Sequence, residues 1–334
     1  MFKKIFLLFL TATIILSACG TFEVSINQIQ TPTAPAGDPT KIALEIEATS
    51  MSAFVTQQAA TLWPPPPAPT VTDISGTPDT PTPQPPPGLV QPIVVYPPYD
   101  SPTGYLLGGS QNGMWLDSGA TAVLLEGGEQ YGIYTDKAFL YTVTGSAPAQ
   151  NPPYCPAMQA IALDPKPSPA SVVAIGGSWN ALPRIPQELS TENDSYRQVI
   201  GDMLRANGLV QSDILLTRVL KVDLEGDGTD EVLISASRFS DESGHDVSSG
   251  DYSLIVLRKV AGNTAITIPM VTYYYLESQL LAYPNKYTLS AVMDLNGDGR
   301  MEILVGITGW EKVGTLGYEV DQSAVRNILD VRCP

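Results

Sequence analysis

The segment VDLEGDGTDEVLI at residues 222–234 returns later in the chain as MDLNGDGRMEILV at residues 293–305. With Asp223 and Asp294 taken as position 1, both copies carry an oxygen-bearing side chain at positions 1, 3, 5 and 9, and glycine at positions 4 and 6. β-prone runs precede and follow each copy, at 215–222 and 232–236 and again at 287–293 and 303–307. The repeat therefore predicts two acidic loops, each of which connects two strands of a mainly β body.

The spacing of the oxygen-bearing residues suits a loop that wraps a hard cation. Calcium takes roughly six to eight oxygen ligands, and side chains at positions 1, 3 and 5 of a curled loop point to one centre. Glycine at position 6 permits the sharp turn that brings the position 7 carbonyl round, and the acid at position 9 closes the site. Without an ion, carboxylates this close would repel one another and raise their own pKa values. The alternative is a solvated hairpin, because Asp, Asn and Gly are ordinary turn formers.

Position 12 separates this pattern from an EF-hand, which needs a bidentate Glu there, because the chain has Ile234 and Val305 instead. The pattern resembles the FG-GAP and VCBS-type repeats, in which such a loop links two strands of a β-propeller blade. The resemblance covers residues 213–334 and implies two calcium sites. The implied ligands are Asp223, Glu225, Asp227, Glu231 and the Thr229 carbonyl in the first loop, and Asp294, Asn296, Asp298, Glu302 and the Arg300 carbonyl in the second.

Further β-prone runs at 251–257 and 316–320 extend each unit to strand, loop, strand, excursion, strand. A closed propeller of about four to eight blades needs more chain than the foldable part provides. We therefore expect a partial, β-propeller-like body with blade-type antiparallel units over 191–334. An N-terminal β region over 93–190 carries short β-prone runs at 105–107, 114–116, 120–125, 131–135 and 138–144.

One packing helix is expected around the apolar stripe that ends before Gly208. Its apolar stripe sits at i, i+3, i+4, i+7 and i+8, from Tyr196 to Leu204. Asn193 or Asp194 can cap its start and Gly208 can end it.

The N-terminus has the order of parts of a secretory signal. Lys3 and Lys4 precede an apolar run over 5–16 that is short for a membrane span. The tetrapeptide LSAC at 16–19 resembles the lipobox of bacterial lipoproteins. That resemblance implies cleavage after residue 18 and a diacylglycerol group on Cys19, so the rest of the chain would be extracytoplasmic and held at the cell surface by lipid. The alternative is an ordinary signal peptide with a chance cysteine.

Residues 19–92 are expected to form a disordered, Pro/Thr-rich tether. Residues 31–100 hold 17 of the 30 prolines, and such a composition favours extended polyproline II and builds no core. The stretch 41–62 is nearly free of proline and glycine, and its apolar residues allow a short helix that would be marginal in water.

Two cysteines, Cys155 and Cys333, remain after Cys19. Thiols outside the cytoplasm usually pair, which predicts a disulfide, with two buried free thiols as the alternative.

The bulk charge excludes one class of partner. Asp and Glu number 34 against 18 Lys and Arg, for a formal net charge of −16, whereas a nucleic-acid binder needs a basic face. The chain has one histidine, His245, which excludes a metal centre built from several histidines. The sequence also holds no nucleophile elbow, Walker loop or zinc-protease helix.

We therefore expect a lipid-anchored, calcium-binding protein that is not an enzyme and acts as a binding or adhesion module for a protein or glycan. The run Tyr273-Tyr274-Tyr275, with Trp310 and Tyr318, could form a sugar-binding platform or be half-buried sheet residues. A secreted polysaccharide hydrolase and a purely structural envelope protein remain as alternatives.

Overall fold

Strands dominate the part of the chain that the computed structural model describes, which is residues 88–96, 101–150, 155, 158–168, 172–261, 264–310, 312–321 and 324–333. All of them belong to one compact unit. The mainly β prediction is confirmed. The predicted signal peptide, Cys19, the helix at 41–62 and nearly all of the tether lie outside the described residues.

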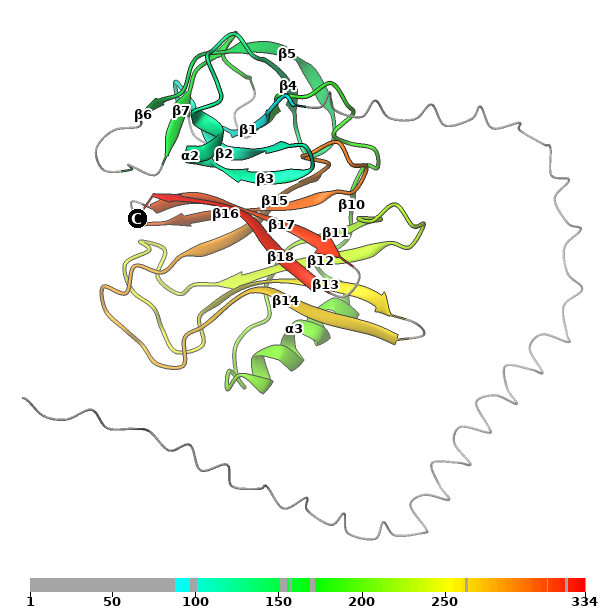
Figure 1. The fold of residues 1–334 in the computed structure, drawn as a ribbon. Coiled ribbons are helices and arrows are strands. Elements are labelled where there is room, and N and C mark those ends of the chain that lie inside the picture. The colour runs from blue at the N-terminus through cyan, green and yellow to red at the C-terminus, as the bar shows by residue number, and fades with distance from the viewer. Residues whose placement is uncertain are drawn as a thin grey trace, which may run out of the picture. The chain divides into compact units, whose positions relative to one another are not determined.

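The first sheet holds nine strands in the described residues and curls into a half-barrel (Figure 1). Its order is β6-β7-β2-β1-β9-β4-β5-β8, with β3 paired to β2, and all of its pairings are antiparallel. The strands are β1 (Gln91–Val95), β2 (Gly104–Gln111), β3 (Met114–Asp117), β4 (Gln130–Tyr134), β5 (Phe139–Gly145), β6 (Ala149–Gln150), β7 (Gln159–Ile161), β8 (Leu163–Asp164) and β9 (Val173–Ile175).

One short run in this region is helical, so the strand prediction for 120–125 is wrong. Helix α2 (Ser118–Ala122) begins after Asp117, whose carboxylate accepts the backbone N–H of Ala120 at 2.7 Å. This N-cap stabilises the first turn, typically by about 1 kcal/mol, and it outweighs the weak β preference of the run that follows.

The second and third sheets each contain one of the repeats. The second sheet runs β10-β11-β12-β13-β14 and the third runs β15-β16-β17-β18. Strands β11 to β14 and β15 to β18 are therefore two antiparallel meanders of four strands each, the blade-type unit that the repeat predicted. The strands are β10 (Gln187–Glu188), β11 (Leu216–Val222), β12 (Glu231–Arg238), β13 (Tyr252–Ala261), β14 (Thr264–Tyr274), β15 (Lys286–Met293), β16 (Glu302–Gly309), β17 (Lys312–Asp321) and β18 (Ala324–Cys333).

The third sheet lies between the other two, and the layers are visible in Figure 1. Neighbouring residues such as Val292 and Met293, which point to opposite faces of β15, are both fully buried. One core joins all three sheets, with Ile93 from the first, Leu233 from the second and Ile303 from the third.

Helix α3 (Asp194–Ala206) covers the outer face of the second sheet. Ile200 and Leu204 pack there against Ile234 and Val256, and each such buried side chain contributes about 1.5–3 kcal/mol. The Asn193 side chain accepts the Ser195 N–H at 3.0 Å. The predicted helix and its Asn193 cap are confirmed.

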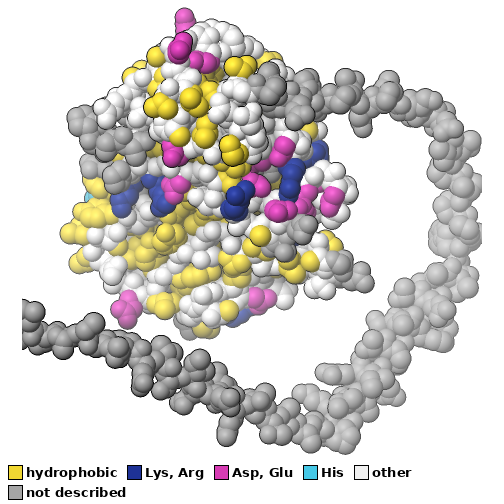
Figure 2. Space-filling view, in the orientation of Figure 1, with side chains coloured by type: hydrophobic (Ala, Val, Ile, Leu, Met, Phe, Trp, Pro, Cys, Tyr) yellow, Lys and Arg dark blue, Asp and Glu magenta, His cyan; other side chains and the backbone are white. Residues whose placement is uncertain are grey.

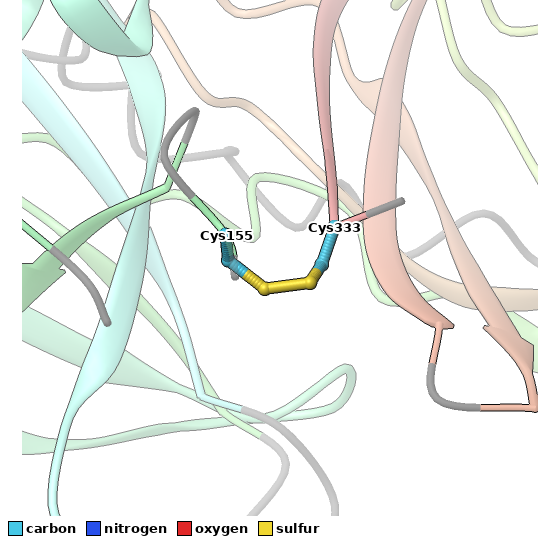
Figure 3. The surroundings of a disulfide bond; sticks show 2 residues. All are labelled: Cys155 and Cys333. Atoms are coloured by element: carbon cyan, nitrogen blue, oxygen red, sulfur yellow. A yellow bond between two sulfur atoms is a disulfide. The ribbon is translucent and has the colours of Figure 1, made fainter. Parts of the chain in front are cut away.

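The predicted disulfide is also present. Cys155 bonds to Cys333 with their Cα atoms 5.0 Å apart (Figure 3). Cys155 lies between β6 and β7 of the first sheet and Cys333 ends β18 of the third. The bond therefore ties the curled sheet to the repeats, and such a link typically stabilises by about 2–4 kcal/mol.

Candidate functional site

The first acidic loop, residues 223–230 between β11 and β12, folds around the carboxylate of Asp223. This carboxylate accepts the N–H of Gly226 at 2.7 Å through Oδ1 and that of Gly228 at 3.0 Å through Oδ2. Both glycines have positive φ, 75° and 84°, a conformation that other residues adopt only at a cost. Glu231 at position 9 accepts the N–H of Leu224 at 2.9 Å. Acids at both ends of the loop thus hold it closed.

The second acidic loop, residues 294–301 between β15 and β16, repeats this geometry. Asp294 accepts from Gly297 at 2.6 Å and from Gly299 at 2.9 Å, and the two glycines have φ of 79° and 84°. Glu302 accepts the N–H of Leu295 at 2.7 Å. The turn expected at the position 6 glycine is confirmed in both loops, and the position 4 glycine turns as well.

Position 5 stabilises position 7 in both copies. Asp227 accepts the N–H of Thr229, and Asp298 accepts that of Arg300, each at 2.8 Å. The second carboxylate oxygen of Asp298 accepts from the side-chain amide of Asn296 at 3.2 Å. The same hydrogen bonds within each loop therefore give the two loops the same backbone scaffold.

The two loops lie side by side. The N–H of Met301 donates to the carbonyl of Leu224 at 2.9 Å. Arg184, from the link between the first and second sheets, donates to the Gly299 carbonyl at 2.8 Å, to the Leu224 carbonyl at 3.3 Å and to the Asp223 carbonyl. One guanidinium therefore clamps both loops, a role that no local motif in the sequence indicates.

The same link fixes the start of the second loop. The indole N–H of Trp179 donates to the carbonyl of Asp294 at 2.9 Å, and the N–H of Asp294 donates to the carbonyl of Ala181 at 2.8 Å. Trp179 and Ala181 are both buried in the main core. Position 1 of the second loop is thus held by the protein interior.

Burial perturbs the acids that close the loops. Asp294 and Glu302 are 0 % and 1 % exposed, and neither is the solvated side chain of a simple surface hairpin. Burial raises the pKa of Asp294 to about 6, with Asp298 adding to the rise and the loop N–H groups opposing it. Burial also raises the pKa of Glu302 well above its usual value, and the charges of Asp298, Asp294 and Glu319 raise it further.

Glu231 in the first loop is buried in the same way. Its pKa is raised by burial and by the charges of Asp227 and Asp223. Its Oε1 is buried and accepts no hydrogen bond from the described residues. An acid in this state favours a nearby positive charge.

In the first loop that charge comes from a side chain. Lys259 on β13 forms an ion pair with Glu225 at position 3, and its Nζ lies 4.0 Å from Glu231 Oε1. The guanidinium of Arg300 lies 3.3 Å from the other oxygen of Glu225. Glu225, which the resemblance implied as a metal ligand, is therefore engaged by two basic side chains.

The second loop differs at the same point of the repeat. Position 10 of the first loop, Val232, pairs with Arg258 on β13, and the next residue on that strand is Lys259. Position 10 of the second loop, Ile303, pairs with Tyr318 on β17, and the next residue there is Glu319. In the described part of the chain, no Lys, Arg or His side chain forms an ion pair with the second loop's acids, which are Asp294, Asp298 and Glu302. On the face that Figure 2 shows, most basic side chains lie beside acidic ones in a band across the middle of the body.

The second loop fits calcium by its donor chemistry. Three carboxylates, the Asn296 amide oxygen and the Arg300 carbonyl are the hard oxygen donors that this ion prefers, and two of the carboxylates are buried without a basic side chain paired to them in the described residues. Within the described residues, however, no group of three or more His, Cys, Asp or Glu side chains converges closely enough to hold a metal ion. Binding would thus require the exposed Asp298 and its partner Asn296 to exchange their mutual hydrogen bond for the ion.

The aromatic residues considered for a sugar-binding platform lie in different surroundings. Tyr318 is buried in the main core, and the ring of Tyr273 stacks on that of Tyr287 at 5.1 Å. Trp310 is 45 % exposed and packs edge-on against His245. Of the aromatic residues considered for this platform, Trp310 and Tyr273 are exposed, and Tyr274 and Tyr275 are half-buried.

None of the helices in the described residues is long and apolar enough to cross a bilayer. No family model, no curated protein and no solved structure matches the chain.

Proposed function

We propose that this protein binds calcium in its second acidic loop and acts, anchored by lipid outside the cytoplasm, as a non-catalytic binding or adhesion module. The observation that carries the proposal is the pair Asp294 and Glu302, which are buried together without a basic partner in the described residues. Burying carboxylates is costly unless a positive charge compensates. A divalent ion supplies that charge.

The residues that would hold the ion are Asp294, Asn296, Asp298, Glu302 and the backbone carbonyl of Arg300. Asp294 and Glu302 are already positioned by loop N–H groups, and Trp179 and Ala181 fix the loop backbone from the core. Calcium would therefore order the link between the first and second sheets as well as the loop, and so stabilise the surface offered to a protein or glycan.

The location outside the cytoplasm rests on two features. One is the lipobox-like LSAC at 16–19, and the other is the disulfide between Cys155 and Cys333, a bond typical of oxidising compartments. If Cys19 carries lipid, the full-length chain sediments with membranes when expressed in bacteria, and Cys19→Ser releases it into the soluble extracytoplasmic fraction. A Cys19→Ser chain that stays with the membrane would contradict the anchor.

Calorimetric titration of calcium chloride into the full-length chain tests the metal site. Wild type should bind the ion, and Glu302→Gln should bind it at least about tenfold more weakly, since one buried charged ligand is removed. Asp330→Asn is the matched control, because Asp330 is an exposed acid of the same sheet that pairs with Arg332 and should leave binding unchanged. Equal affinity of Glu302→Gln and wild type would refute the site.

A further inference from the structure

Lys259 is an unusual residue to find beside an acidic loop that matches a metal-binding pattern. Its side chain is only 10 % exposed, it forms an ion pair with Glu225, and its Nζ lies 4.0 Å from Glu231 Oε1, which accepts no hydrogen bond from the described residues. Positions 3 and 9 of the first loop are the two acids that it faces. A lysine ammonium thus lies where the resemblance would direct a metal ion toward the same carboxylates.

We infer that the Lys259 ammonium replaces a metal ion in the first acidic loop, so that the chain binds one calcium ion and not two. The inference rests on the proposed function, because the single ion is assigned to the second loop. It changes the role of the first loop from a second metal site to a metal-independent copy of the same fold.

Charge at one position of the repeat supports this assignment. The residue that follows the partner of position 10 is Lys259 in the first repeat and Glu319 in the second. Glu319 adds negative charge near Glu302, and the resulting repulsion raises the pKa of that buried acid. In the first repeat the residue at this point therefore pairs with the position 9 acid. In the second, Glu319 pairs with Arg326 at 2.9 Å, and no basic side chain of the described residues pairs with Glu302 itself.

A metal ion in the first loop would also meet repulsion. The Arg300 guanidinium lies 3.3 Å from Glu225, so two positive side chains already share this carboxylate. Burial and the charge of Arg300 lower the pKa of Lys259, and the charge of Asp321 opposes this shift. A divalent ion would have to displace Lys259 from Glu225 and Glu231 before it could bind them.

Two reciprocal variants test the inference by the number of calcium ions bound per chain. Calcium chloride is titrated into the full-length protein, and folding of each variant is checked by circular dichroism. Wild type should bind one ion. Lys259→Met, which removes the ammonium from Glu225 and Glu231, should bind two, and Glu319→Lys, which places an ammonium beside the second loop, should bind none.

Lys221→Met is the matched control, because Lys221 lies on β11 and pairs with Asp230 at 2.7 Å without contacting Glu225 or Glu231. It should bind one ion, as wild type does. Two ions in wild type, or one ion in a folded Lys259→Met chain, would overturn the inference and leave the calcium function standing. Should Lys259→Met not fold, Glu319→Lys decides, and undiminished binding by that variant would overturn the inference.

The two proposals fail differently. A wild-type chain that binds no calcium, beside a Lys259→Met chain that binds one ion, would support the replacement by lysine and overturn the proposed function. Absence of calcium binding in wild type and in both variants would overturn both.

Discussion

The two acidic loops share a backbone and differ in their charge environment. Each folds around a position 1 aspartate, turns on two glycines with positive φ, and is closed by a buried glutamate at position 9. In the first loop Lys259 pairs with Glu225 and Glu231, and Arg300 pairs with Glu225, whereas no basic side chain in the described residues pairs with the acids of the second loop. The loop pattern therefore specifies a backbone scaffold, whereas the charge that faces its position 9 acid depends on a strand residue outside the pattern.

Replacement of the position 1 aspartate should give the largest difference between the two loops in their response to calcium. Asp223→Ala and Asp294→Ala each strip the carboxylate acceptors from the loop N–H groups, which should cost about 3 kcal/mol in chelator. Only Asp294→Ala should also abolish the stabilisation by calcium. Urea unfolding with calcium and with chelator measures both effects. Loss of the calcium effect in Asp223→Ala, or its survival in Asp294→Ala, would contradict the comparison.

The guanidinium of Arg184 is the feature that the loops share. Arg184→Met removes donors from carbonyls of both loops, including those of Leu224 and Gly299, and should lower the free energy of unfolding by about 2 kcal/mol even without calcium. Calcium affinity should fall too, because the second loop loses its brace. Arg205→Met, on the exposed side of α3, is the control. An Arg184→Met chain as stable as this control would show that the loops do not depend on the clamp.

The position 6 glycines offer a matched pair that isolates the backbone. Gly228 and Gly299 both have φ of 84°, and a Cβ added to either would meet no atom within 4 Å. Alanine at either site should therefore cost only the left-handed conformation, about 1 kcal/mol, and the two costs should be equal in chelator. Thermal unfolding of both variants checks this. A cost at one glycine more than about twice that at the other would mean that the two scaffolds are not equivalent.

Features encoded by short spacing could be predicted from the sequence. The acidic loops between strands, helix α3 with its Asn193 cap and the mainly β class all depend on residues that lie within one element or turn. The disulfide could be predicted because only two cysteines are left to pair once Cys19 is assigned to the lipid anchor.

Features that depend on tertiary placement could not be predicted in this way. Arg184 reaches Gly299 across 115 residues, and Lys259 reaches Glu225 across 34. Lys259 and Glu319 lie at equivalent positions only once the strand registers are known, since the excursions after the two loops differ in length. The burial of the third sheet between the other two is likewise a consequence of packing, which the periodicity of single strands does not encode.

Thermal unfolding of the full-length chain in calcium and in chelator tests the central claim most directly. At a calcium concentration about 100 times the Kd, binding to the folded state alone adds about 2.7 kcal/mol, which corresponds to a rise in Tm of roughly 5–10 °C for a body of this size. Wild type and Asp223→Ala should both show the rise, and Glu302→Gln should show at most about half of it. An identical Tm for wild type in calcium and in chelator would contradict the account.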